Sequence, residues 1–377
     1  MNNLEYDGQY YHSDTIPVMY KRYIILGDEM TLLCHSKKVS ESKRPILNIS
    51  NLKILPLKKR NSFKELIFGA SKTENIVKEE VFKADICVVH LPSYHGSIVV
   101  KYAKKYSKPY MTVICACPWD GLWNFNWKGK LMAPESYLRL RMAQRNAPFS
   151  IYVTKYFLQQ RYPTSGKSIN CSNVNIKTGN SAVLNRRLEK ISKWKNEKRP
   201  LCIGTAAAID VPYKGQQYVI RAIGQLRNMG IRMEYHIVGP GNKDRLQKII
   251  NSMNLNEQIF IHGVLPHDNM ADYYDNIDIY VQPSKQEGLP RSLIEAMSRG
   301  CLCLGSNIAG IPELLTKQFL FQKGDIEGIV RILNSITSDT MREEAIKNFE
   351  LAKEYDQDIL NERRKNFLME FKSSLIE

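Results

Sequence analysis

Short apolar runs rich in β-branched residues alternate with longer amphipathic stretches along most of this chain. In the first half we expect strands at 30–34, 54–57, 85–91, 111–115 and 150–154, with helices at 62–71, 96–105 and 134–145. A second series of strands follows at 201–204, 233–238, 258–261, 277–282, 301–305 and 319–322, with helices that include 216–228 and 290–299. Such alternation is typical of parallel sheets that helices cover on both faces.

The length of 377 residues suits two domains better than one compact core. We therefore expect two doubly wound α/β domains, at 1–176 and 177–355, and a helix at 356–377 that packs back on the first domain. Ligands bind such sheets at the carboxyl ends of the strands, so two facing sheets create a cleft. The first dozen residues are polar, and we expect either that the usual opening strand is missing or that the first sheet is built differently.

The formal charge is +16, and residues 1–176 carry most of the excess, with 26 Lys and Arg against 13 Asp and Glu. This charge permits nucleic acid, an anionic membrane surface or a phosphorylated substrate as a partner. The chain has no nucleic-acid-binding motif and no short basic arm, so we expect no nucleic acid partner and favour the membrane. Eight cysteines without a CxxC pair, no secretory signal and no apolar run of spanning length favour a cytoplasmic protein.

The most informative stretch runs from Val281 to Met297 and is expected to form a strand, a turn and a helix. Pro290 suits the first position of that helix, and the free N–H groups of a helix start favour an anion. Glu287 lies in the turn, and Glu295 lies off the apolar stripe of the helix. Both carboxylates are therefore available to accept hydrogen bonds from sugar hydroxyls, although two Glu at this separation also occur by chance.

The second half also contains, in this order, Tyr213-Lys214-Gly215, Gly239-Pro240-Gly241, His262-Gly263-Val264 and Gly310-Ile311-Pro312-Glu313. With the Glu287 and Glu295 pair, these segments resemble the donor domain of retaining glycosyltransferases of family 4, of the bacterial surface-polysaccharide type. The resemblance implies the GT-B fold, in which two Rossmann-like doubly wound domains face each other across a cleft. It also implies transfer of a sugar from a nucleotide sugar to a hydroxyl of a lipid-linked or saccharide acceptor, in capsule, O-antigen or exopolysaccharide synthesis.

The resemblance further implies a role for each matched residue. Lys214 would contact the diphosphate of the donor, Glu287 its sugar and Glu295 its ribose, while the backbone around Val264 would meet the base. No metal and no cofactor are expected, because Lys and backbone groups would hold the donor. The expected donor site is completed by Thr205, Gly239, Gly288 and Leu289.

One cation of the family pattern is missing from the second half. The family commonly has an Arg just after the strand that precedes Lys214, but this chain reads Gly204-Thr205-Ala206-Ala207. A cation in the first turn of a helix opposes the helix dipole unless an anion lies nearby. We therefore hypothesise that Arg291 replaces the missing Arg, the alternative being that Arg291 is a solvated surface residue.

In the first half, polar residues follow two expected strands. His90 and His95 flank the start of a helix, and Asp120 lies in the next loop, where relatives often carry a His. We take His95 and Asp120 as catalytic candidates beside Glu287, although a lone His is more often structural and Asp before Gly is an ordinary turn former.

Four aromatic residues crowd the loop that contains Asp120, and two lysines accompany them. The group comprises Trp119, Trp123, Phe125, Trp127, Lys128 and Lys130. Such a loop either packs under the cleft or contacts an amphipathic surface, and aromatic with basic residues suit a lipid interface. We expect a peripheral protein on the inner face of the cell membrane. The alternatives are a catalytically impaired GT-B scaffold or donor-binding protein, and less favoured, a nucleic-acid-binding protein.

Overall fold

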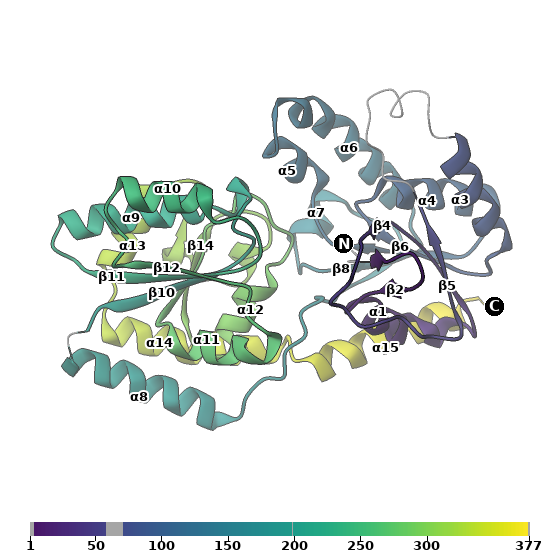
Figure 1. Ribbon diagram of the computed structural model, residues 1–377. Helices are drawn as coiled ribbons and strands as arrows, with labels where there is room; N and C mark the ends of the chain where they lie inside the picture. Colours follow the sequence, from purple (N-terminus) through teal and green to yellow (C-terminus); the bar gives the residue numbers. More distant parts are fainter. Residues whose placement is uncertain (1–3, 58–70, 198, 376–377) are drawn as a thin grey trace.

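The computed structural model describes residues 4–57, 71–197 and 199–375, which form two α/β domains (Figure 1). The main sheet of the first domain is parallel and has the order β6 (Cys87–Leu91), β7 (Tyr110–Ile114), β8 (Phe149–Tyr152) and β9 (Lys167–Asn170). A separate parallel pair consists of β3 (Met30–Cys34) and β5 (Leu52–Pro56). Every strand that the sequence predicts in this half overlaps one of these strands.

The helices of the first domain are α1 (Ile16–Tyr23), η1 (Ile24–Leu26), α3 (Ser71–Lys83), α4 (Tyr94–Lys105), α5 (Pro118–Trp123), α6 (Trp127–Arg145) and α7 (Phe157–Arg161). The helix expected at 62–71 lies outside the described residues except for its last position. Helix α6 begins seven residues before the predicted start, because Asn126 caps it by accepting a hydrogen bond from the Gly129 N–H (2.8 Å). The prediction of a single loop here is wrong: Trp127, Lys128 and Lys130 lie on α6, and Trp119, Asp120 and Trp123 lie on α5.

The opening residues form a short strand in a small separate sheet, which agrees with the expectation that the first sheet is built differently from the usual pattern. Strand β1 (Leu4–Tyr6) pairs with β2 (Tyr11–His12) and with β4 (Ser36–Lys38) in a three-stranded sheet. This sheet is separate from β6–β9, so the first domain is not one continuous doubly wound sheet in the described residues.

The second domain contains six parallel strands in the order β12 (Ile259–Gly263), β11 (Met233–Val238), β10 (Leu201–Ala206), β13 (Ile279–Gln282), β14 (Leu302–Ser306) and β15 (Leu320–Phe321). The strand order reverses between β10 and β13, and ligands bind α/β sheets beyond the carboxyl ends of the strands at such a point. Each strand overlaps a prediction from the sequence.

Helices cover both faces of this second sheet (Figure 1). Helices α9 (Gln216–Asn228), α10 (Asp244–Ser252) and α13 (Ile326–Asn334) lie on one face, and α8 (Ser181–Glu197), α11 (Met270–Asn276), α12 (Arg291–Met297) and α14 (Ser338–Lys353) lie on the other. Short 3₁₀ turns are η2 (Pro212–Lys214), η3 (His267–Asn269), η4 (Ile311–Glu313) and η5 (Lys317–Phe319).

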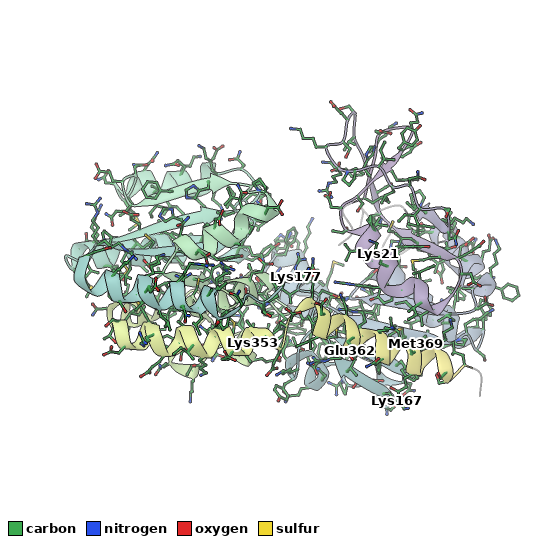
Figure 2. The ribbon with its side chains drawn as sticks, turned by 90° about the horizontal axis from the view of Figure 1, so that it is seen from below. Lys21, Lys167, Lys177, Lys353, Glu362 and Met369 are labelled. Atoms are coloured by element: carbon green, nitrogen blue, oxygen red, sulfur yellow. The ribbon has the colours of Figure 1, made fainter. Side chains whose placement is uncertain are left out.

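After α14 the chain returns to the first domain as α15 (Gln357–Ser373), which runs along its underside (Figure 2). The N–H of Gln357 donates to the Ile176 carbonyl (2.8 Å), where the chain first leaves that domain. Farther along, Arg364 donates to the Ser172 carbonyl (2.9 Å) and Lys372 to the Ile25 carbonyl (3.0 Å). Within the described residues, no helix combines the length and the apolar character needed to cross a membrane.

The packing of α15 generates a stability prediction. Phe371 is 1% exposed, and its ring centroid lies 5.0 Å from that of Phe149 on β8. Phe371→Ala should lower the free energy of unfolding in urea by about 3–5 kcal/mol, because it removes a buried ring and leaves a cavity. Met369 lies on the same helix but is 42% exposed, so Met369→Ala should change that free energy by no more than about 0.5 kcal/mol. Equal losses in the two variants would contradict the docking of α15.

Candidate active site

A carboxylate and an ammonium group, 73 positions apart in sequence, meet beyond the carboxyl end of β13. Lys214 donates through Nζ to Oε1 of Glu287 (2.6 Å), and Gln282 donates through Nε2 to the same oxygen (3.0 Å). Gln282 is buried, and its carbonyl oxygen accepts from the Tyr280 hydroxyl (2.9 Å), which directs its NH₂ group toward Glu287. Glu287 is therefore held in place from two elements of the second domain.

The position of Lys214 depends on the glycine that follows it. Gly215 has a φ of +82°, and a Cβ at this position would lie 1.9 Å from the carbonyl oxygen of Pro283. Only glycine fits such an approach. The N–H of Lys285 also donates to the Tyr213 carbonyl (2.7 Å). These backbone contacts fix the end of η2 against the loop that carries Glu287.

Glu295 lies on α12, two turns beyond Glu287. As predicted from the sequence, Leu293, Ile294 and Met297 are buried, while Glu295 is half-buried. Its Oε2 accepts a hydrogen bond from the Tyr274 hydroxyl (2.8 Å). Burial, and then the charge of Glu295, raises the pKa of Tyr274 well above its ordinary value, so this hydroxyl keeps its proton and orients the carboxylate.

Helix α12 is shorter than predicted at both ends. It begins at Arg291 because Pro290 is extended (φ −73°, ψ 116°) and serves as the N-cap residue, without a side-chain hydrogen bond to the first turn. Arg291 is exposed and has no hydrogen bond or ion pair to any described residue. Burial, and then the charges of Arg364 and Arg291, lowers the pKa of Arg22 on α1. Arg22 of the first domain therefore lies within electrostatic reach of Arg291, the first residue of α12 in the second domain.

The structure places the side chain of Thr205, a predicted donor-binding residue, inside the second sheet. Its side chain is fully buried, and its hydroxyl donates to the Val281 carbonyl (2.8 Å) and accepts from the Tyr235 hydroxyl (2.8 Å). The residue therefore joins β10 to its two neighbouring strands.

Gly239 and Val264 follow adjacent strands at the carboxyl edge of the second sheet. A Cβ on Gly239, whose φ is +150°, would lie 1.9 Å from the Ala207 carbonyl oxygen, so the loops after β10 and β11 are in close contact. Val264 follows β12 and is 69% exposed. The backbone near Val264 is accordingly open to a ligand at this edge.

The loop that carries Glu287 also touches the first domain. Asn124 at the end of α5 donates to the Lys285 carbonyl (3.1 Å), and a Cβ on Gly288 would lie 2.2 Å from the Cys115 carbonyl oxygen. When the Gln286 amide is oriented with its nitrogen toward the neighbouring carbonyl groups, that nitrogen donates to the Asp120 carbonyl (2.9 Å). The structure therefore brings the backbone of Asp120 next to the Glu287 loop. The Asp120 carboxylate itself is half-buried, 3.7 Å from Nη2 of Arg161.

Leu289 anchors this junction. It is 9% exposed and belongs to a hydrophobic core that includes residues of both domains. Leu289 therefore packs the loop that carries Glu287 against the core.

The two histidines that follow the start of β6, His90 and the predicted His95, differ in exposure. His95 is 9% exposed, and its ring packs edge-on near His35 (4.9 Å) and Tyr94 (5.5 Å). The His90 side chain is exposed, at the carboxyl edge of the first sheet. The ring of His90 also packs edge-on against an aromatic ring, that of Tyr23 (5.6 Å), so the catalytic role of His95 stays a prediction.

The structure describes one group of three side chains that could hold a metal ion together. Cys202, Glu234 and His236 lie on β10 and β11, with potential ligand atoms within 4.8 Å of one another. Cys202 and Glu234 are near the amino ends of their strands, whereas Lys214 and Glu287 follow carboxyl ends. This group therefore lies apart from the candidate active site.

Sequence reasoning missed the residues that support the carboxylates. Gln282 could have been predicted as a site residue, because it is the polar last residue of an otherwise apolar and aromatic strand.

Glu313 was noted in the sequence only as part of a motif. Its carboxylate accepts from the backbone N–H groups of Lys155 (2.6 Å), Tyr156 (3.1 Å) and Phe157 (2.7 Å), and so caps α7 of the first domain from the second.

Comparison with known proteins shows which enzyme family the second domain resembles. Residues 186–351 match the family model described as Glycosyl transferases group 1. The second domain is therefore similar to group 1 glycosyl transferases. The chain is also 29% identical to protein CapJ of Staphylococcus aureus over 378 residues, which covers 98% of this chain and 93% of CapJ. It is 32% identical over 130 residues to the amylovoran biosynthesis glycosyltransferase AmsK of Erwinia amylovora, which covers 32% of each chain.

Solved structures of similar fold include sucrose-phosphate synthase from Thermosynechococcus elongatus, with a TM-score of 0.70 and 12% identity over 99% of this chain and 96% of that one. Another is HepE of Anabaena in complex with UDP-glucose, with a TM-score of 0.58 and 16% identity over 84% and 86% of the two chains. These likenesses establish the fold, and the two domains have the GT-B architecture predicted from the sequence.

The environment of His90 generates a pH prediction. Although the His90 side chain is exposed, the protein atoms that surround this edge of the sheet, and then the charges of Arg22 and Arg364, lower its pKa to about 4. The imidazole should therefore be neutral at neutral pH, and an NMR titration of its side chain should have a midpoint near 4. Because the unfolded chain binds this proton near pH 6.5, the folded state should lose stability as the pH falls between these two values. A midpoint near 6.5 in the folded protein would contradict the placement of His90.

Proposed function

We propose that this protein is a retaining glycosyltransferase of family 4 that transfers a sugar from a nucleotide sugar to an acceptor hydroxyl. The observation that carries the proposal is the Lys214–Glu287 ion pair, which lies beyond the carboxyl end of β13 and beside the loops of the first domain. The pair offers a cation for a diphosphate and a carboxylate for sugar hydroxyls at one place. Retention is inferred from the resemblance of the segment around Glu287 and Glu295 to that family.

The charges around α12 suit the chemistry of the leaving group. A departing nucleoside diphosphate develops negative charge, which preorganised donors stabilise without rearrangement. Lys214 would leave its ion pair with Glu287 to contact the diphosphate, which frees the carboxylate for the sugar. The exposed Arg291 would supply the second cation in place of the Arg that is absent from the loop after β10.

The remaining donor contacts follow from the same geometry. Glu295, oriented by Tyr274, would accept a hydrogen bond from the ribose, and the open backbone near Val264 would meet the base. Gly239 and Gly288 would allow close approach of the diphosphate and the sugar to the backbone. The complex of HepE with UDP-glucose makes a uridine nucleotide sugar the first donor to test. The proposed donor site uses Lys and backbone groups and does not require a metal ion or a cofactor.

The first domain would bind the acceptor. Asp120 lies beside the Glu287 loop, and His90 lies at the carboxyl end of β6. Either group would orient the acceptor hydroxyl, and the Asp120 carboxylate would assist removal of the proton from that hydroxyl. The name of AmsK supports a role in polysaccharide synthesis. We infer a lipid-linked acceptor at the inner face of the cell membrane, for a protein that works from the cytoplasm, because the excess positive charge of the first half suits an anionic surface.

Nucleotide binding and turnover test the proposal together. In a thermal-shift panel, nucleoside diphosphates and nucleotide sugars should raise the melting temperature, whereas oligonucleotides should not. Glu287→Ala should lower turnover of the stabilising nucleotide sugar by about 10²–10³-fold, because it removes a charged partner of the reacting sugar. Glu257→Ala, which changes an exposed Glu in the second domain, is the control and should leave turnover unchanged. Stabilisation without turnover in the wild type would instead support a donor-binding scaffold.

The role of Arg291 gives a separate kinetic prediction. Arg291→Ala should raise the KM for the donor roughly tenfold, which corresponds to about 1.4 kcal/mol, because one diphosphate contact is lost. Arg342→Ala removes another exposed Arg of the second domain and should not change the KM. If both variants kept the wild-type KM, Arg291 would be a solvated residue and the missing cation would have no replacement.

A further inference from the structure

Helix α6 presents four larger apolar residues to solvent. Four exposed apolar residues lie along it, namely Trp127 (67% exposed), Leu131 (73%), Leu138 (54%) and Met142 (67%). At about 100° per residue, all four fall within a sector of about 60° on one side of the helix. We call these four residues the α6 stripe.

The opposite side of α6 faces the protein with smaller or polar residues. Its buried residues are Gly129, Ala133, Ser136, Leu140, Ala143 and Gln144. An ordinary surface helix buries its larger apolar residues and exposes polar ones. Helix α6 buries Leu140 in the ordinary way but leaves the four residues of the α6 stripe exposed on its opposite side, and a contiguous exposed apolar patch marks an interaction surface.

The end of α5 extends the α6 stripe. Trp123 (41% exposed) and Phe125 (71% exposed) lie next to it in sequence and in space, and the ring of Trp123 stacks on that of Trp119 (5.2 Å). Figure 1 shows α5 and α6 on the side of the first domain away from α15. The apolar surface therefore continues from α6 to the end of the first domain that adjoins the second.

Basic residues border the α6 stripe on both sides. By helical position Lys130 and Arg141 lie on one side of it, and Lys128 and Arg139 on the other. Lys128 and Lys130 place their ammonium groups over the rings of Trp127 (5.6 Å) and Trp123 (5.8 Å). Between residues 123 and 145 the sequence has five basic residues and a single acidic one. Apolar side chains edged by cations complement the acyl and phosphate layers of an anionic bilayer.

We propose that α5 and α6 form the surface by which this protein rests on an anionic lipid bilayer, with the α6 stripe inserted at the level of the headgroups. This inference deepens the proposed function, since it names the surface that would face a membrane-held acceptor. Asn124 lies between Trp123 and Phe125, and its amide donates to the Lys285 carbonyl, two residues before Glu287. The docked surface thus leads directly to the loop of the candidate catalytic carboxylate, and an acceptor held in the bilayer reaches the site without leaving it.

Vesicle sedimentation of the full chain, without any donor, tests the proposal. At low salt the wild type should sediment with vesicles of 30% phosphatidylglycerol in phosphatidylcholine and should be released by high salt, because charge attraction is screened. Leu131→Ser with Leu138→Ser, and separately Lys128→Glu with Lys130→Glu, should each weaken binding about tenfold or more. All four side chains are exposed, so thermal unfolding should be unchanged.

Matched controls come from the second domain. Met229→Ser changes an equally exposed apolar residue (55% exposed), and Lys317→Glu with Lys323→Glu reverses two exposed charges. These variants should sediment like the wild type. The proposal is overturned if the wild type does not sediment, or if the variants of α6 sediment as well as the controls.

Two further measurements separate the alternatives. If the Leu131 and Leu138 variant changes the size of the particle in solution but not vesicle binding, the stripe covers a second copy of this chain and the proposal is wrong. Transfer to a water-soluble acceptor should be retained in that variant, while transfer to an acceptor embedded in vesicles should fall. If the wild type binds vesicles but transfers sugar to neither acceptor, the proposed function is wrong, while the proposal that α5 and α6 bind the bilayer is retained.

Discussion

The carboxylate of Glu313 is the contact on which the arrangement of the two domains most depends. It belongs to the second domain, yet it accepts three backbone N–H groups at the start of α7 in the first. A carboxylate suits a helix start both by hydrogen bonding and by the helix dipole. Because the three donors are successive backbone groups, this contact fixes orientation as well as distance between the domains.

Close backbone contacts complete the same junction. The N–H of Gly310 donates to the Gly288 carbonyl (2.9 Å), and Gly288 in turn approaches the Cys115 carbonyl of the first domain. A side chain on either glycine would separate these loops. Glu287, the residue before Gly288, is consequently positioned by both domains, and the candidate active site exists only where the domains meet.

The sequence predicted the periodic features of this protein well and the individual contacts poorly. The strands and the apolar stripe of α12 follow from repeated patterns of burial, so Leu293 and Ile294 are found where expected. The hydrogen bonds of the Thr205 hydroxyl to neighbouring strands could not be predicted, because sequence position alone does not reveal them. The same holds for the packing of His95 against His35, which lies 60 positions from His95 and in a different sheet region. The cap of Asn126, which starts α6 early, is a local signal that could have been found.

The two places where the chain crosses between the domains lie side by side. Ile176 on the outgoing segment pairs with Asp356 on the returning one, and the Asp356 carboxylate accepts from the Thr178 N–H (2.8 Å). Two crossings tied together act as a single hinge, about which the domains can rotate but along which they cannot slide. Opening of the molecule on the far side of that hinge would separate Glu313 from α7 and the Glu287 loop from the end of α5, but it would not require any helix to unfold.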